Sequence, residues 1–377
     1  MSKWIVIPDS FKGTMSSQEI CGIIAEQLRS RIPDAQVITV PVADGGEGSV
    51  DAFLAAVGGQ RVEVPCTGPR GRTVNGFYGR LSDGRTAVVE MAAAAGLTLM
   101  GDTPDVWEAT TCGVGELIAH AVRGGARRIV LCLGGSATND GGCGCAAALG
   151  VRFTDDRGEV FLPVGGTLDR VAHIDVTGCK ELLRGVEVEV MCDIDNPLCG
   201  DTGASVVFGP QKGASPEMVR LLDRNLAHLA DVIRQDLGVE VAELPGSGAA
   251  GGMGAGAVAF LNGRLRMGIE TVLDLAQADE LFPGSVVITG EGRIDGQSVR
   301  GKVVSGVARR AKQAGAPVIV IAGDIAPGAE RAYDLGVTAM FSTNRRAVPW
   351  ELARQTARED LRAAAGDVAR LCAALTR

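Results

Sequence analysis

The sequence predicts an α/β protein of two domains, and three observations support this prediction. Predicted strands alternate with predicted helices at both ends of the 377-residue chain, whereas the middle contains strands without intervening helices. Hydrophobic residues make up 46% and charged residues 22%, so the chain can bury a large core. Aromatic residues are only 4%, and 53 residues are glycine. The core must therefore consist of Val, Ile, Leu and Ala with close backbone contacts.

The amino-terminal part follows a strand–helix–strand–helix order. Residues 3–8 are an apolar run that predicts a buried strand. Ser16, with Glu19 three residues later, is typical of a capping box, and apolar residues then recur at helical spacing. Residues 35–42 predict a second strand, and residues 50–57 a second helix.

The carboxyl-terminal part repeats the alternation. Its predicted strands are 285–289, 317–322 and 338–342, and its predicted helices are 302–314, 327–335 and 350–375. Such alternation predicts parallel strands with right-handed crossovers. Two strands from the start and three from the end predict one five-stranded, doubly wound parallel sheet of the flavodoxin-like type.

The middle of the chain has a different order of elements. An antiparallel meander is expected over residues 61–64, 73–81 and 86–91, with Ser82-Asp83-Gly84 as a hairpin turn. Further elements are then expected at 111–123 (helix), 129–133 (strand), 143–149 (helix), 186–192 (strand) and 216–237 (helix). We therefore expect a second α/β domain with a mixed sheet, residues 61–284, inserted into a discontinuous domain of residues 1–60 and 285–377.

Charge and cysteine content exclude several classes of protein. The formal net charge is −8 and no basic block occurs, so we expect no nucleic-acid partner. Ten cysteines form no C-x-x-C pair, which favours reduced, buried thiols. No apolar run reaches about 18 residues and no signal peptide is recognisable. We expect a cytoplasmic protein without a membrane partner.

Glycine-rich turns, most of them carrying acids, are the main functional signal. They cover residues 41–49, 134–144, 191–204, 246–256 and 289–302, and only the fourth lacks an acid. Glycine turns allow an anion to approach backbone N–H groups, and carboxylates in the same turns can hold Mg²⁺. An anion cradle combined with Mg²⁺ ligands is the equipment of phosphoryl transfer.

Two candidate loops follow the first two predicted strands. Asp9-Ser10-Phe11-Lys12-Gly13 lies at a carboxyl end, where open α/β sheets bind ligands, and Lys12 could neutralise phosphate oxygens. It could equally be an ordinary loop with a solvated lysine. Asp44 begins a segment with three glycines; it could be only a helix cap, but glycines there favour close approach of a ligand.

The segment 134–142 lies between a predicted strand and a predicted helix. Its N–H groups and hydroxyls could meet a phosphate at the helix start. It is neither a Walker A loop nor a G-x-G-x-x-G motif. A purely structural turn is the alternative. The segment 246–256 could be a hinge, a close-packing segment or a nucleotide loop, and these alternatives stay open.

Two carboxylates, Asp193 and Asp195, end an apolar strand before Asn196-Pro197 breaks it. Like charges at a strand end favour a metal ligand or a catalytic base, and a solvated acidic turn is the alternative. In the last glycine turn, Arg293 offers a fork for a carboxylate or phosphate, and Asp295 could orient a hydroxyl. A capped loop is the alternative there.

Taken together, these motifs resemble the bacterial glycerate kinase family, of the type that phosphorylates the 2-hydroxyl of D-glycerate. The resemblance covers essentially the whole chain and rests on PDSFKGTMSS (8–17), ADGGEGS (43–49), GGSATNDGG (134–142), CDIDNPLCG (192–200), VFGPQKGAS (207–215), GAAGGMGAG (248–256) and TGEGRIDGQSVRGK (289–302). It implies two α/β domains with an active cleft between them, and ATP, Mg²⁺ and glycerate as ligands.

We therefore expect an ATP-dependent kinase that converts D-glycerate to 2-phosphoglycerate and ADP. The alternatives are a kinase for another small hydroxy acid and a non-catalytic regulator that binds a nucleotide or metabolite. The candidate residues are Lys12, Asp193 and Asp295 for catalysis; Asp9, Ser10, Asp44 and Arg293 for substrate; Gly134, Gly135, Ser136, Thr138, Asp140, Gly290 and Glu291 for nucleotide; and Asp193 with Asp195 for metal.

Overall fold

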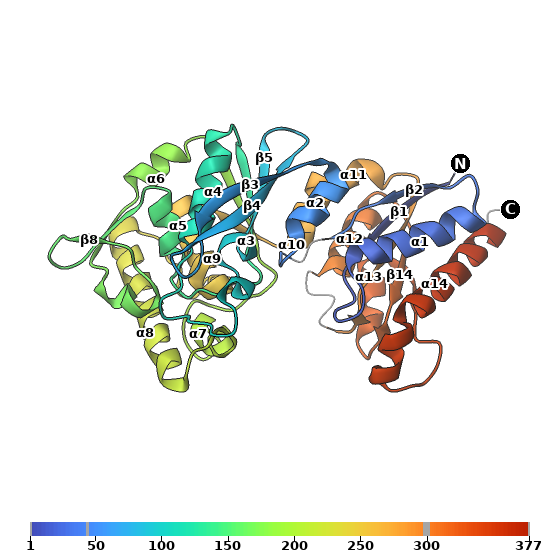
Figure 1. Ribbon diagram of the computed structural model, residues 1–377. Helices are drawn as coiled ribbons and strands as arrows, with labels where there is room; N and C mark the ends of the chain where they lie inside the picture. Colours follow the sequence, from blue (N-terminus) through green and yellow to red (C-terminus); the bar gives the residue numbers. More distant parts are fainter. Residues whose placement is uncertain (1, 43–44, 297–301, 376–377) are drawn as a thin grey trace. The chain divides into compact units, whose positions relative to one another are not determined.

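The computed structural model describes residues 2–42, 45–296 and 302–375, and its contacts divide the chain into two compact units. Unit 1 consists of Met1–Asp44, Ala55–Val57 and Met267–Arg377, and unit 2 of Gly45–Leu54 and Gly58–Arg266. Figure 1 shows the blue amino-terminal and red carboxyl-terminal elements side by side in unit 1.

The boundaries between the units differ from those predicted. The sequence placed them after residues 60 and 284, whereas the contacts place the main ones after residues 44 and 266. Helices α10 (Gly268–Leu275) and α11 (Ala278–Leu281) consequently belong to unit 1. The reason is tertiary, because these helices are tied to a later helix by ion pairs that the local sequence does not reveal.

Unit 1 contains a five-stranded parallel sheet in the order β2-β1-β12-β14-β16. Its strands are β1 (Lys3–Pro8), β2 (Gln36–Thr39), β12 (Ser285–Gly290), β14 (Val318–Ala322) and β16 (Val337–Ser342). Numbered within the unit, this is the order 2-1-3-4-5, so the flavodoxin-like prediction is confirmed. The change of direction lies between β1 and β12, which pair in register from Lys3↔Ser285 to Pro8↔Gly290.

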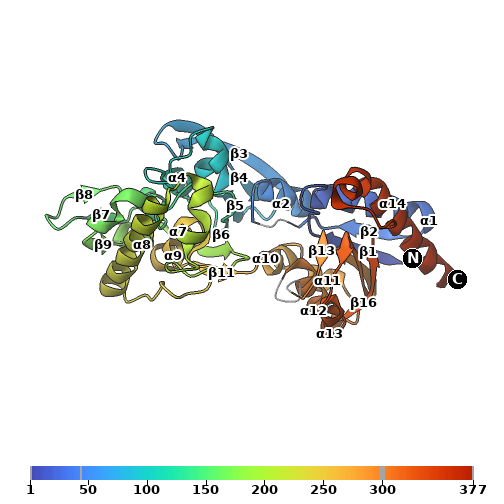
Figure 2. The same cartoon turned by 90° about the horizontal axis from the view of Figure 1, so that it is seen from below.

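Helices cover both faces of this sheet (Figure 2). Helices α1 (Ser17–Arg31) and α14 (Trp350–Leu375) lie on one face, where Trp4, Ile24 and Leu361 are buried together. The predicted capping box is present: Glu19 N–H donates to Ser16 Oγ at 3.2 Å, and Ser16 N–H donates to Glu19 Oε2 at 2.9 Å.

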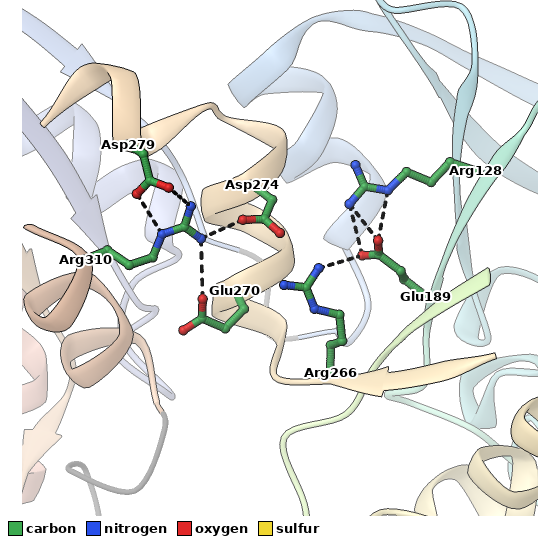
Figure 3. A network of polar contacts seen from close by, with 7 residues as sticks. All are labelled: Arg128, Glu189, Arg266, Glu270, Asp274, Asp279 and Arg310. Carbon is green, nitrogen blue, oxygen red and sulfur yellow. Dashed lines mark hydrogen bonds and ion pairs between the residues drawn. The ribbon is translucent and has the colours of Figure 1, made fainter. Parts of the chain in front are cut away.

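The opposite face carries α12 (Val303–Gln313) and α13 (Ala332–Leu335). A single helix over residues 327–335 was predicted, but a 3-10 turn, Ala329–Arg331, precedes the short α13. Arg310 of α12 binds three carboxylates from the two preceding helices (Figure 3). These are Glu270 (3.4 Å), Asp274 (2.7 Å) and Asp279 (2.6 Å). The cluster fastens α10 and α11 to α12.

Unit 2 contains a six-stranded mixed sheet in the order β11-β10-β6-β5-β4-β3. Its strands are β3 (Gly59–Thr67), β4 (Thr73–Leu81), β5 (Thr86–Glu90), β6 (Arg128–Cys132), β10 (Glu187–Met191) and β11 (Arg264–Arg266). Strands β3, β4 and β5 form the predicted antiparallel meander, and β5, β6, β10 and β11 are parallel. The predicted mixed sheet is therefore confirmed.

Around this sheet, unit 2 places the predicted helices α2, α4, α5 and α8, together with further helices and a small sheet that the sequence did not predict. The helices are α2 (Ser49–Val57, in unit 2 as far as Leu54), α3 (Ala92–Ala95), α4 (Cys112–Arg123), α5 (Cys143–Ala148), α6 (Thr177–Leu182), α7 (Ala204–Phe208), α8 (Pro216–Leu237) and α9 (Ala249–Leu261). The small sheet consists of β7 (Arg152–Thr154), β8 (Val160–Phe161) and β9 (His173–Asp175). Its strands are too short to give a clear period-two pattern.

A second polar cluster stabilises the parallel part of the unit 2 sheet. Glu189 of β10 accepts hydrogen bonds from Arg128 of β6 at 2.9 Å and from Arg266 of β11 at 3.3 Å (Figure 3). The carboxylate thus joins three neighbouring strands. All ten cysteines are free thiols, and seven of them are buried, as expected for small apolar side chains.

Among the helices that the structure describes, none combines the length and the apolar sequence that a membrane crossing requires.

Candidate functional site

In unit 1, the loops after β1 and β12 meet at the carboxyl edge of the sheet. Asp9 N–H donates to Gly290 O at 2.8 Å. A Cβ on Gly292 would lie 3.4 Å from Phe11 Cα and 3.6 Å from Lys12 N, so the two backbones run in contact. These are the strands between which the sheet changes direction, which is where such sheets bind ligands. The structure therefore brings Asp9, Ser10 and Lys12 next to Gly290 and Glu291.

The side chains at this edge differ in exposure. Lys12 is exposed, Asp9 and Ser10 are half-buried, and Glu291 is buried. Ser10 N–H donates to Asp9 Oδ1 at 2.7 Å, which orients the Asp9 carboxylate locally. Gly290 has a packing reason of its own, because a Cβ there would lie 1.9 Å from Ile321 O.

Arg293 lies on a short strand beyond the same turn. Strand β13 (Arg293–Ile294) pairs with β15 (Asp324–Ile325), and Arg293 Nε lies 3.5 Å from Asp324 Oδ2. The Arg293 side chain is 64% exposed, so this ion pair is weak and a ligand carboxylate can compete for the guanidinium. Asp295 is half-buried two residues on. Asp44 and residues 297–301 of the last motif lie outside the described residues.

In unit 2, three chain segments meet at the carboxyl ends of the parallel strands. Gly134, after β6, donates its N–H to Gly45 O at 2.7 Å. A Cβ on Gly134 would lie 2.5 Å from Gly46 Cα, and one on Gly45 would lie 3.6 Å from Met191 O at the end of β10. Only glycine permits this approach of the 45–48 turn to the segment after β6. Three of the glycine turns that the sequence singled out, those near residues 45, 134 and 191, thus meet at this edge of the unit 2 sheet.

Glu90 was missed by the sequence analysis and lies at this edge. It ends β5, is 1% exposed, and accepts N–H bonds from Val50 at 2.5 Å and from Gly48 at 3.3 Å. Burial raises the pKa of Glu90, and these two hydrogen bonds oppose the shift. Its signal in the sequence was a carboxylate at the end of an otherwise apolar strand.

Less of the 134–142 loop is accessible to solvent than its predicted role in phosphate binding implies. Gly135 is exposed and Gly134 is half-buried, whereas Ser136, Thr138 and Asp140 are buried. The N–H groups of Gly134 and Ala137 already donate to Gly45 O and Ala95 O. A ligand can therefore reach the start of the loop, from Gly134 to Ser136, more readily than its end.

Asp140 acts inside the protein rather than at a ligand surface. Its carboxylate accepts bonds from Thr111 N–H and the Thr111 hydroxyl, both at 2.8 Å, and from Gly142 and Gly144 N–H, both at 3.2 Å. Burial raises the pKa of Asp140, which these donors oppose. The structure speaks against the predicted nucleotide contact of this residue, because its carboxylate joins the starts of α4 and α5 from within.

Lys212 is a second residue that the sequence analysis missed. It ends a 3-10 turn, Pro210–Lys212, and is only 2% exposed. Its Nζ donates to Ser136 Oγ at 2.9 Å and to Thr138 O at 2.7 Å. Burial lowers its pKa to about 7. The available signal was the VFGPQKGAS motif, in which Gly209 and Gly213 flank the Pro-Gln-Lys run, but local sequence cannot tell a buried lysine from a solvated one.

Asp193 and Asp195 follow β10, and both are exposed. Within the described residues, no group of three or more acidic, histidine or cysteine side chains is placed to hold a metal ion. Mg²⁺ is commonly held by one or two carboxylates together with phosphate oxygens and waters. The two exposed carboxylates therefore fit a Mg²⁺ that arrives with a nucleotide.

The 246–256 segment packs closely against the 134–142 loop. Gly141 N–H donates to Gly251 O at 3.0 Å, and a Cβ on Gly251 would lie 1.9 Å from Thr138 O. Ala250, Gly251 and Gly252 have left-handed backbone conformations. Of the three readings left open for this segment, the structure supports close packing.

A surface cavity of about 560 Å³ lies elsewhere in unit 2, at the small sheet. It is lined by residues 155–157, 159, 169–172 and His228, most of which are acidic or arginine side chains. None of the candidate residues lines it, so its volume does not mark the site described above.

Comparisons with known proteins agree with these motifs. The model of the "Glycerate kinase family" matches residues 4–373. A "Glycerate kinase" of Bacillus subtilis (strain 168) is 45% identical over 369 residues, 97% of each chain. A "Glycerate 2-kinase" of Escherichia coli (strain K12) is 46% identical over 342 residues, 90% of each chain. A crystal structure named for a glycerate kinase 2 from Salmonella typhimurium LT2 has 44% identity and a TM-score of 0.86, covering 100% of this chain and 99% of that one.

Proposed function

Because this chain belongs to the glycerate kinase family, we propose that it transfers the terminal phosphoryl group of ATP to the 2-hydroxyl of D-glycerate. The products are 2-phosphoglycerate and ADP. The observation that carries the proposal is that, in each unit, glycine turns meet at the carboxyl ends of parallel strands, beside groups suited to phosphate, carboxylate or Mg²⁺. Such edges are where open α/β sheets bind ligands.

We assign the nucleotide phosphates to the start of the 134–142 loop. Gly134 and Gly135 allow close approach of the backbone, and the Ser136 hydroxyl lies next to them. Gly290 and Glu291 of unit 1 remain candidates for the nucleotide. Thr138 and Asp140 lie further along the same loop and are buried, so we assign them to supporting the loop from within the protein.

We assign Mg²⁺ to Asp193, with Asp195 beside it. The bound ion would neutralise charge on the phosphate oxygens during transfer. The protein contributes carboxylates at a strand end, where the chain is fixed by the pairing of β10 with β6.

Glycerate is a small anion with a hydroxyl, so it needs a cation and a hydrogen-bond acceptor. We assign its carboxylate to Arg293 and the orientation of its hydroxyl to Asp295, with Asp9, Ser10 and Asp44 as further contacts. Lys12 meets the transferred phosphoryl group, because it lies on the same edge as the Glu291–Arg293 turn. The proposal includes the active site between the two domains that the resemblance implies, and a cytoplasmic location.

The deciding experiment couples ADP release to a spectrophotometric readout over a panel of small hydroxy acids. D-glycerate should be the best substrate, activity should disappear when EDTA removes Mg²⁺, and NMR should identify 2-phosphoglycerate as the product. Preference for another hydroxy acid would select the alternative kinase. Nucleotide binding without turnover of any panel member would select the non-catalytic regulator.

A further inference from the structure

The Lys212 side chain lies under the loop to which the nucleotide phosphates are assigned. Lysines normally keep their amine in water even when the aliphatic stem is buried, yet Lys212 is 2% exposed. Its Nζ donates to the Ser136 hydroxyl and to the Thr138 carbonyl, at 2.9 and 2.7 Å. Two contacts to one short loop, from a residue 74 to 76 positions away in sequence, show that the lysine supports this loop.

The interior around this lysine is polar and incompletely hydrogen-bonded. The Thr138 Oγ1 and Asn139 Oδ1 atoms are buried and have no hydrogen-bond partner among the described residues. Asp140 is the charged group that acts on the Lys212 amine, and its negative charge raises the lysine pKa while burial lowers it more strongly. The Asp140 oxygens are occupied by Thr111, Gly142 and Gly144. No carboxylate of the described residues therefore pairs directly with the lysine amine.

The hydrogen-bond direction at Ser136 is set by Lys212. A protonated lysine has no lone pair and can only donate to this hydroxyl, so the Ser136 oxygen is the acceptor while Lys212 is charged. The hydroxyl hydrogen then remains available to donate to another group. A phosphate oxygen at the exposed start of the loop is a suitable acceptor for it.

We propose that Lys212 is a positioning residue for nucleotide binding: it fixes the Ser136 hydroxyl as a donor to phosphate and supplies positive charge beneath the loop. This inference rests on the assignment of nucleotide phosphates to that loop. An arriving anion favours the protonated form of Lys212, so binding takes up a proton wherever the free protein is partly neutral.

The sign of the pH effect follows from the lysine charge. Below the Lys212 pKa of about 7 the ammonium is already present and binding is strongest; above it, binding must also protonate the amine and weakens. The ligand should be Mg·ADP, measured by isothermal titration calorimetry from about pH 6 to about pH 8.5, a range that brackets this pKa.

Lys212→Met is the central variant, because it keeps the length of the side chain and removes its charge and donors. We expect about tenfold weaker binding of Mg·ADP near pH 6, the equivalent of one lost charge-assisted hydrogen bond. The difference from wild type should shrink as pH rises. Comparing the two proteins removes the ligand's own ionisation from the result, because the ligand is the same.

Ser205→Ala is the matched control. Asn139 Nδ2 donates to Ser205 Oγ at 3.1 Å, so this serine also supports the loop from below, but without charge. It should leave the pH dependence of binding unchanged, even if it lowers stability. If Lys212→Met does not fold, as judged by thermal unfolding, Ser136→Ala tests the same contact and should weaken Mg·ADP binding most at low pH.

Two results would overturn the inference: wild-type affinity and pH dependence in Lys212→Met, or the same change of pH dependence in Ser205→Ala. Failure of the proposed kinase function can be distinguished from failure of the inference about Lys212. A wild-type protein that binds Mg·ADP but turns over no glycerate contradicts the proposed function and leaves Lys212 testable. If the wild-type protein turns over glycerate normally and Lys212→Met binds Mg·ADP as the wild type does, only the proposed role of the lysine is contradicted.

Discussion

At the residue scale, the exposed carboxylates after β10 make a direct prediction about metal. Asp193 and Asp195 are solvent-exposed at the end of a paired strand, so replacing one should not disturb the core. Asp193→Asn should remove most of kcat, because Mg²⁺ would lose a charged oxygen ligand. Steady-state kinetics over a Mg²⁺ series check this, and near-normal kcat at saturating Mg²⁺ would reassign the metal.

A second prediction at this scale concerns the effect of replacing Arg293 on the use of glycerate. The exposed guanidinium of Arg293 lies 3.5 Å from Asp324 Oδ2 through Nε, and a substrate carboxylate would use the planar fork. Losing that contact should cost roughly 2–4 kcal/mol of transition-state binding, about 30- to 1000-fold in kcat/KM for glycerate. Arg293→Lys should be nearly as damaging as Arg293→Ala, because lysine has no fork.

Lys12→Ala and Asp295→Asn extend the same experiment along the unit 1 edge. A change below roughly threefold in kcat/KM, less than 1 kcal/mol, would remove the residue concerned from the site.

Asp140 is expected to affect stability rather than nucleotide affinity. Its carboxylate accepts bonds from Thr111, Gly142 and Gly144 while fully buried. Asp140→Asn turns an amide N–H₂ group toward some of these donors, which should lower the free energy of unfolding by about 3 kcal/mol. Urea unfolding measures this loss. If instead stability is unchanged and the KM for ATP rises, Asp140 belongs to the nucleotide site as the sequence first indicated.

At the element scale, the left-handed turn of α9 decides whether the 134–142 loop keeps its position. Gly251→Ala would place a Cβ 1.9 Å from Thr138 O in a left-handed conformation, so it should destabilise the protein by more than about 2 kcal/mol. Ala250→Gly is the matched control: Ala250 has φ 53° and ψ 40°, and glycine relieves its strain. It should be neutral or stabilise by about 0.5–1 kcal/mol. Thermal unfolding of both variants checks the pair.

The bounds of helices and strands were the part of the structure that the sequence predicted most accurately. The strand Lys3–Pro8, the strand Thr73–Leu81 and the helix Pro216–Leu237 were predicted at their observed bounds. Each has a strong hydrophobic periodicity or a clear helix cap. Ser215 is such a cap, because its Oγ accepts a hydrogen bond from Met218 N–H. The short strands β7, β8 and β9 were missed, because two or three residues carry no readable period.

At the scale of the whole molecule, the two units have separate stabilising networks. Arg310 binds its carboxylates within unit 1, and Glu189 binds its arginines within unit 2 (Figure 3). Multidomain proteins often unfold in more than one transition. Arg310→Met and Glu189→Gln should therefore lower different transitions in scanning calorimetry, each by about 2–4 °C for a loss near 1 kcal/mol. A single transition that both variants shift equally would show that the units unfold together.

The sequence by itself determined the class of fold and the chemistry of its loops. Alternating strands and helices at both chain ends fixed the doubly wound sheet, because periodicity and caps are local properties of the chain. The glycine turns marked strand ends, because glycine is required where backbones approach closely. Arg293 and Lys12 could be placed on one edge of the sheet, because strand order follows from crossover rules.

Only the tertiary structure decided what each polar group in those loops contacts. Lys212 reaches the 134–142 loop across more than 70 residues, and Glu90 accepts from Val50 across 40, so no local pattern contains either contact. Burial separated Asp140, which joins helices internally, from the exposed Asp193, although both appear in similar glycine–acid turns. A charged side chain has the same sequence signal in water and in the core; its neighbours, brought together by folding, determine its protonation and its role.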